Sequence, residues 1–328
     1  MASSSSKIAL IMGVANTRSI AWACVEHFTR HDWKVIVTCQ SQTICDKVEP
    51  LLRDRIGTSS SSSTGTGSKI LACFPCNALS DLKDDPNNEP VGSSSQSSTP
   101  TRPLSMFQQR LGPILEDQPL STVVHCLAYA PNIKTTPLLQ TTRDDFLHAQ
   151  EVSAYSLIQV ARQTKDYLLR RRSHTTLPQH VNDDHDPSTT APCTPSITAL
   201  SYLGAVRAVP GYHAMGPAKA SLESIVRGLA LELAHTENDN GARIRVNAVS
   251  AGPLPTLSAK GGIAGFDQMR HEMQRRAPLG NITTDQVAST VQFLSSDAAS
   301  GITGQTIYVD GGYSIVAGPE LRKPSGLS

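Results

Sequence analysis

Short apolar runs rich in β-branched residues recur along the chain and alternate with segments of helical periodicity. The runs are Lys7–Met12, Trp33–Cys39, Lys69–Phe74, Ser121–Leu127, Ser196–Tyr202, Arg243–Val249 and Gln305–Val309. Between them, segments such as Arg143–Leu169 and His213–His235 repeat apolar residues at helical spacing. The alternation predicts parallel βαβ units, and continuous apolar runs are typical of strands buried on both faces. We therefore expect an α/β fold with a single Rossmann-type doubly wound parallel sheet of about seven strands and helices on both faces.

Three segments interrupt this alternation. Residues 57–68 are almost all Ser, Thr and Gly, residues 84–102 are rich in Pro, Asn and Ser, and residues 172–195 are rich in His, Asp, Thr and Pro. Such compositions bury too little apolar surface to offset the entropy lost on ordering. We interpret all three as flexible surface insertions in one domain that spans residues 1–318, followed by a C-terminal tail at 319–328.

Composition excludes several classes of protein. The chain has 29 Lys and Arg against 28 Asp and Glu, which argues against a nucleic-acid or membrane-surface partner. It has no apolar run long enough to span a membrane. Its 7 irregularly spaced cysteines fit a reducing compartment. No signal peptide is evident, so we expect a cytoplasmic protein, or a plastid or mitochondrial one if a targeting segment has been removed.

Two segments resemble metal sites, and we expect neither to bind a metal. The pair Cys73 and Cys76 has the CxxC spacing, but no second pair completes a zinc site. The insertion at 172–195 contains His174, His180 and His185, yet nothing fixes their geometry. We interpret the first as a chance spacing and the second as a solvated loop.

The loop after the first apolar run is the candidate phosphate-binding segment. In a doubly wound fold the first strand-to-helix loop binds the pyrophosphate of a dinucleotide. Gly13 would allow a sharp turn there, and Ser19 would offer a hydroxyl and an N–H at a helix N-terminus. The G-x-G-x-x-G pattern is absent, because Ala15 and Arg18 occupy the later glycine positions. Gln40 ends the second run as a neutral ribose-binding residue, which favours NADH over NADPH.

Several segments together resemble the short-chain dehydrogenase/reductase superfamily and, within it, the enoyl-[acyl-carrier-protein] reductases of type II fatty-acid synthesis. The resemblance is carried by Gly13–Ala23 (GVANTRSIAWA), Val37–Gln40 (VTCQ), Val124–Pro131 (VHCLAYAP), Ser201–Glu223, Arg245–Ala259 and Gly301–Ile315. It covers almost the whole chain outside the three insertions. Most members of the superfamily have a Ser thirteen positions before the catalytic Tyr, where this chain has Ala199. Tyr202 stands where the enoyl reductases have a second active-site tyrosine.

The resemblance implies a set of site residues. Tyr212 and Lys219 would be the catalytic pair, with Tyr202 as the second tyrosine. Ala130 would touch the acyl substrate. The residues implied in binding the nicotinamide cofactor are Gly13, Ser19, Ile20, Gln40, Asn77, Ala78, Leu127, Lys219, Leu254, Pro255, Thr256, Leu257 and Ser258. Asn77 departs from the family, which usually has Asp there, and Pro255 departs from a frequent Arg.

The chemistry of these residues suits reduction of a carbon–carbon double bond. Hydride addition to Cβ of an enoyl thioester places negative charge on the thioester oxygen, where a tyrosine hydroxyl such as that of Tyr212 can donate a hydrogen bond. Lys219 lies seven residues beyond Tyr212, about two helical turns, and can bind ribose hydroxyls. We therefore predict NADH-dependent reduction of the 2,3 double bond of enoyl thioesters in fatty-acid biosynthesis. Two alternatives remain: a 3-oxoacyl reductase or another carbonyl or alcohol oxidoreductase, and a non-catalytic scaffold that retains the fold.

The expected partners follow from the same interpretation. The acyl group would be carried by acyl carrier protein or by CoA. Because a carrier protein is acidic, the basic residues Lys260, Arg270, Arg275 and Arg276 are candidates for its docking. The apolar stripe on the helix after Tyr212 suits a core or a subunit interface, and the resemblance implies a homotetramer.

Overall fold

The computed structural model describes residues 7–57, 68–82, 105–170, 194–235 and 243–317. Its centre is a sheet of 7 strands in the order β3-β2-β1-β4-β5-β6-β7, with every neighbouring pair parallel. The strands are β1 (Ile8–Met12), β2 (Lys34–Cys39), β3 (Ile70–Pro75), β4 (Thr122–His125), β5 (Ser196–Ser201), β6 (Arg245–Ala251) and β7 (Thr306–Val309). The predicted doubly wound parallel sheet is confirmed.

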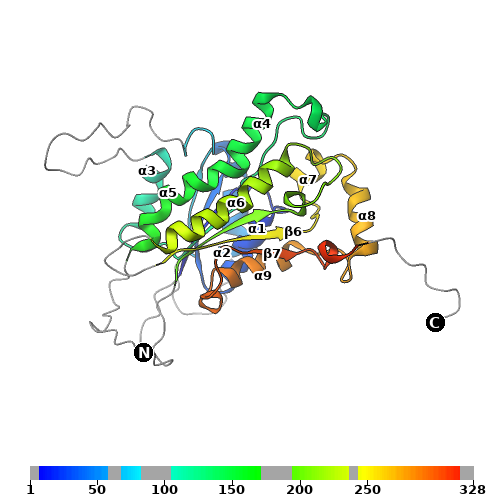
Figure 1. Cartoon of the computed structure of the whole chain (residues 1–328). Coiled ribbons are helices and arrows are strands. Elements are labelled where there is room, and N and C mark those ends of the chain that lie inside the picture. The colour runs from blue at the N-terminus through cyan, green and yellow to red at the C-terminus, as the bar shows by residue number, and fades with distance from the viewer. Residues whose placement is uncertain (1–6, 58–67, 83–104, 171–193, 236–242, 318–328) are drawn as a thin grey trace, which may run out of the picture.

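Helices cover both faces of this sheet (Figure 1). On one face lie α3 (Met106–Leu115), α5 (Ser156–Leu169) and α6 (Met215–Ala234), whose apolar residues share one buried cluster. On the other face lie α1 (Ile20–Arg30), α2 (Gln42–Gly57) and α9 (Thr284–Leu294), which share a second cluster. The remaining helices are α4 (Arg143–Gln150), α7 (Leu257–Gly262) and α8 (Phe266–Arg276).

The strands alternate their side chains between these two clusters. In β1, Ile8, Leu10 and Met12 join the first cluster, whereas Ala9 and Ile11 join the second. All five residues are buried, because helices exclude water from both faces of the strand. This is the physical reason that the strands read in the sequence as unbroken apolar runs.

The order of the strands places a ligand crevice. The chain builds outward from β1 through β2 to β3, then returns to the other side of β1 with β4. In such sheets ligands bind beyond the carboxyl ends of the strands, at the point where the order reverses. That point lies between β1 and β4, where Met12 pairs with His125.

Three differences from the sequence-based expectation concern element ends and one interruption. The fifth strand ends at Ser201 rather than at Tyr202, and the helix after Tyr212 begins at Met215. The helix expected over 143–169 is interrupted by a π-helical turn at Glu151–Tyr155. The apolar spacing alone did not identify that turn, which adds one residue within the helix.

The three insertions at 57–68, 84–102 and 172–195 and the tail at 319–328 lie almost entirely outside the described residues, and so do His174, His180 and His185. Among the helices that the structure describes, none is both long and apolar enough to cross a membrane.

Candidate active site

A cavity of about 630 Å³ opens at the crevice predicted by the strand order. It is bounded by the loop after β1, the segment after β4, the end of β5, the start of α6 and the segment after β6. Most of the implied site residues line it: Gly13, Ser19, Ile20, Leu127, Ala130, Tyr202, Tyr212, Lys219, Leu254, Thr256 and Ser258. The fold therefore brings together residues that are more than 200 positions apart in the sequence.

The charges around the cavity have one sign. Among the described residues that line it, the charged ones are Lys134 and Lys219, and none is Asp or Glu. The N-terminus of α1 adds a partial positive charge at one end, because Ser19, Ile20 and Ala21 lie in the wall. A cavity lined by a helix N-terminus and a buried lysine fits an anionic dinucleotide.

Gly13 is required at the turn into this cavity. Its φ angle is +82°, and a Cβ at this position would lie 2.6 Å from the carbonyl oxygen of Cys126. Its N–H donates to the carbonyl oxygen of Thr38, 3.0 Å away. Only glycine allows the loop after β1 to turn while it touches the end of β4.

The side chain of Ser19 serves the helix itself. Its hydroxyl donates to the carbonyl oxygen of Asn16 at 2.8 Å and accepts from the N–H of Trp22 at 3.1 Å. Its own N–H donates to the same Asn16 oxygen. Ser19 is thus the N-cap of α1, and it orients the first turn toward the cavity. The Ser19 donors that the sequence assigned to a phosphate are engaged within the loop.

The residues implied for the adenosine half of the cofactor lie beside the cavity rather than in its wall. Gln40 is exposed just beyond the end of β2. Asn77 and Ala78 lie just beyond the end of β3, which is the strand next to β2. The side-chain oxygen of Asn77 accepts from the N–H of Leu79 at 2.9 Å and so shapes its own turn. Pro255 and Leu257 also lie outside the lining, and Leu257 is 45% exposed.

The two tyrosines pack against each other. The rings of Tyr202 and Tyr212 lie edge to face, with centroids 4.8 Å apart. Gly204 makes this contact possible, because a Cβ there would lie 2.4 Å from Cδ1 of Tyr212. The hydroxyl of Tyr202 donates to Sδ of Met269 on α8, 3.1 Å away. Sequence analysis missed Gly204, although its position between two tyrosines was a usable signal.

Burial raises the pKa of both tyrosines. Tyr212 is 8% exposed, and its burial raises the pKa of the phenol well above its usual range, with a further contribution from Tyr202. Burial likewise raises the pKa of Tyr202, with a smaller contribution from Tyr313. Both phenols therefore keep their protons at neutral pH and act as hydrogen-bond donors.

Lys219 is a buried cation behind these rings. Its Nζ donates to the carbonyl oxygen of Leu200 at the end of β5, 2.7 Å away. Burial lowers the pKa of Lys219 to about 8, partly offset by Cys126 and Glu223. The nearby His125 is also buried, and desolvation lowers its pKa to about 3, so it is neutral. Lys219 is therefore the charged member of this pair at neutral pH.

A second residue that sequence analysis missed is Ser153. It is fully buried in the π-helical turn, and its hydroxyl both accepts from the N–H of Tyr129 and donates to its carbonyl oxygen, each at 2.9 Å. One side chain thereby fixes the segment between Ala128 and Ala130 that lines the cavity. Extra residues of this kind in helices are frequent at functional sites.

The fold and the cavity define a class of protein. A doubly wound parallel sheet with a Tyr–Lys pair and a helix N-terminus at its switch point is a nicotinamide-dependent reductase of the short-chain dehydrogenase/reductase superfamily. A sequence model of the family described as Enoyl-(Acyl carrier protein) reductase matches residues 186–314. That match covers β5 to β7 and both tyrosines.

Full-length relatives specify the family. The enoyl-[acyl-carrier-protein] reductase [NADH] FabI of Bacillus cereus is 35% identical over 94% of this chain and 97% of its own length. A Bacillus cereus enoyl-acyl carrier protein reductase solved with NADP+ and an indole naphthyridinone has a TM-score of 0.71 and 33% identity, and the match covers 95% of this chain and 97% of that one. The [NADPH] FabI of Staphylococcus aureus is 42% identical over 53% of this chain and 57% of its own length. The chain belongs to the FabI family of enoyl-[acyl-carrier-protein] reductases.

Proposed function

We propose that this protein reduces the 2,3 double bond of enoyl thioesters carried by acyl carrier protein, with NADH as the hydride donor, in fatty-acid biosynthesis. The observation that carries the proposal is the edge-to-face pair of Tyr202 and Tyr212 that lines one cavity with Lys219, without a carboxylate among the described lining residues. Full-length relatives named as enoyl reductases support the same reaction.

Tyr212 is the proposed hydrogen-bond donor to the thioester oxygen. Its ring is held from two sides, by Tyr202 and by Gly204, so little reorganisation is needed when charge develops on that oxygen. A phenol is protonated at neutral pH, and burial raises the pKa of Tyr212 further, so it can donate throughout the neutral range. Ala130, buried at the cavity wall, is proposed to touch the acyl chain.

Lys219 is proposed to hold the cofactor ribose and to keep the potential near Tyr212 positive. Its bond to Leu200 leaves two further N–H donors on the ammonium group. The nicotinamide cofactor supplies the hydride when it is bound. Gly13, Ser19, Ile20, Leu127, Leu254, Thr256 and Ser258 would hold it along the cavity, with Gln40, Asn77 and Ala78 at the adenosine end.

The preference for NADH rests on the end of β2. Gln40 and the adjoining residues Ser41, Gln42 and Thr43 offer no cation for a 2′-phosphate. Relatives with either cofactor in their names or titles exist, so the nicotinamide is common to the family and the phosphate preference is a property of each chain.

A carrier protein and a second subunit are the proposed macromolecular partners. Lys260 is exposed on α7, near the mouth of the cavity, and is the clearest candidate for contact with an acidic carrier. Arg275 and Arg276 form ion pairs with Glu272, which reduces the positive charge they offer. The homotetramer and the cytoplasmic location stay predictions.

The deciding experiment compares substrates. NADH oxidation is followed with crotonyl and 3-oxoacyl thioesters on carrier protein and on CoA, and is repeated with NADPH. We expect turnover with crotonyl thioesters, faster with NADH than with NADPH. Turnover of the 3-oxoacyl thioester alone would favour the carbonyl-reductase alternative. Failure to bind either cofactor by calorimetry would favour the non-catalytic scaffold.

A further inference from the structure

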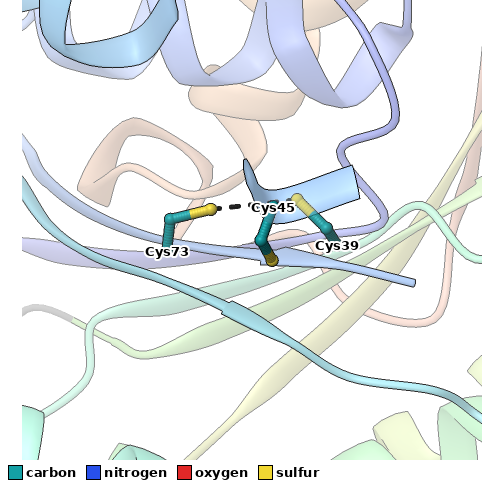
Figure 2. A group of neighbouring side chains, drawn as sticks. All are labelled: Cys39, Cys45 and Cys73. Carbon is teal, nitrogen blue, oxygen red and sulfur yellow. Dashed lines mark hydrogen bonds between the residues drawn. The ribbon is translucent and has the colours of Figure 1, made fainter. Parts of the chain in front are cut away.

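Three cysteine side chains from three elements lie close together (Figure 2). Cys39 is the last residue of β2, Cys45 lies on α2 and Cys73 lies on β3. Their sulfur atoms all lie within 4.8 Å of one another, and the Sγ atoms of Cys39 and Cys73 are 3.8 Å apart. Cys39 and Cys45 are fully buried, whereas Cys73 is only partly covered. The described part of the chain has no other such group of His, Cys, Asp or Glu.

The register of the strands argues against a disulfide between Cys39 and Cys73. Cys39 pairs with Pro75 across the sheet, and Cys73 pairs with Val37, so the two cysteines are offset by two residues. With strands about 4.8 Å apart and a rise of about 3.3 Å per residue, their Cα atoms are about 8 Å apart. A disulfide requires a Cα separation below about 7 Å. The backbone of the sheet would have to move before this bond could form.

The same spacing suits a metal ion at the centre of the three sulfur atoms. Metal–thiolate bonds of about 2.3 Å in a trigonal plane place the sulfur atoms about 4 Å apart. We propose that Cys39, Cys45 and Cys73 form a binding site for one monovalent copper ion, coordinated by the three thiolates. The ion would replace the thiol protons, which leave to solvent.

The number and the type of ligands favour copper(I) over zinc. Structural zinc sites in proteins are almost always four-coordinate, whereas the structure offers three thiols in an apolar setting that includes Val37 and Val48. Soft thiolate ligands suit copper(I), zinc and iron–sulfur clusters, and among these ions the presence of only three sulfur ligands favours copper(I). Cys73 is the entry point, because it is the partly exposed member of the three.

This grouping differs from the one that the sequence suggests. The sequence pairs Cys73 with Cys76 in a CxxC, but Cys76 lies outside the cluster and is buried elsewhere in the core, where desolvation raises the pKa of its thiol to about 12. Consecutive side chains on a strand point to opposite faces, so two residues three positions apart do not share a face. The expectation that the chain binds no metal rested only on the CxxC pair and the histidine-rich insertion, and neither contains Cys39 or Cys45.

The site is tested by titrating the full-length, reduced protein with copper(I) without oxygen, in competition with a chromogenic copper(I) chelator. We expect one ion per chain, and X-ray absorption should show three sulfur neighbours at about 2.3 Å. Replacing Cys45→Ser or Cys73→Ser should weaken binding by more than the ~10–100-fold typical of losing an outer-shell partner. Cys76→Ser is the matched control and should bind copper(I) as the unaltered protein does.

Several results would overturn the proposal. Absence of stoichiometric binding by the folded protein would reject the site, and binding of zinc(II) but not copper(I) would reject the choice of ion. Equal loss in Cys73→Ser and Cys76→Ser, with binding unchanged in Cys45→Ser, would assign the metal to the CxxC. Circular dichroism and thermal melting of each variant show whether it is folded, and Cys73→Ser, at the partly covered position, provides a second test if Cys45→Ser unfolds.

Discussion

The two ends of the proposed cofactor site are built in opposite ways. At the nicotinamide end, Tyr212 and Lys219 are buried. Tyr212 packs against the ring of Tyr202, and Lys219 donates to the carbonyl oxygen of Leu200. At the adenosine end, Gln40 is exposed and lies in a neutral stretch of loop. The first end depends on contacts that a single added methyl group would break. The second end lacks a cation that could bind a 2′-phosphate. We therefore expect it to tolerate substitutions and to determine the preference between NADH and NADPH.

The largest effect is expected at the buried end. Tyr212→Phe removes the donor that we assign to the thioester oxygen, and the loss of one such donor typically lowers kcat by about 10²–10³-fold. Tyr202→Phe should cost much less, because its hydroxyl points to Met269 in the structure. Steady-state kinetics with a crotonyl thioester measure both. Tyr308→Phe, an exposed position on β7, is the control. Equal losses at Tyr202 and Tyr212 would refute the proposed division between the two residues.

Gly204→Ala tests whether close packing at Gly204 holds the Tyr212 ring in position. The added Cβ would lie 2.4 Å from the Tyr212 ring, so the ring must shift. A displacement of about 1 Å at a catalytic group can cost about 10²-fold in rate, and we expect a fall of that size in kcat. Gly228→Ala in α6 is the matched control, because an added Cβ there meets nothing within 4 Å. If both variants keep wild-type kinetics, the ring contact does not position Tyr212.

Some features of the fold and of the site were predictable from the sequence, and others were not. The sheet, its helices and the Tyr–Lys pair were predictable, because apolar periodicity and a seven-residue spacing are local properties of the chain. The edge-to-face contact, the Ser153 hydrogen bonds to Tyr129 and the grouping of Cys73 with Cys39 were not, because they depend on strand order and register. Asn77 and Gln40 stay predictions: Gln40 is exposed and little constrained by packing, and the hydrogen bonds of Asn77 serve its own turn.

Lys219 should make the ligand-free protein less stable than it could be. Burial lowers its pKa to about 8 from an ordinary value near 10.5, so the charged form disfavours folding. That penalty is fully present below about pH 8 and disappears as the pH rises toward 10.5, because the folded state loses its proton first. Relative to Lys219→Met, the wild type should therefore gain about 2 kcal/mol of unfolding free energy between pH 7 and 9.5.

Urea denaturation of both proteins across this range measures that gain. The lost hydrogen bond to Leu200 adds a constant offset and leaves the pH dependence unchanged. Lys260→Met, at an exposed position on α7, is the control and should run parallel to wild type at every pH. A wild-type protein that loses stability relative to Lys219→Met as the pH rises would show that Lys219 is stabilised, not penalised, in its charged form.

The smallest effect is expected at the exposed end. Gln40→Arg places a cation where a 2′-phosphate would lie, and a hydrogen bond to a charged group contributes about 1.5–3 kcal/mol. Kinetics with both cofactors should show at least a tenfold shift of the kcat/KM ratio toward NADPH, with the rate on crotonyl thioesters otherwise retained. Gln42→Arg adds the same charge two residues away on exposed α2 and is the matched control. An equal shift in both variants would mean that the net charge of the surface, rather than a contact at the end of β2, selects the cofactor.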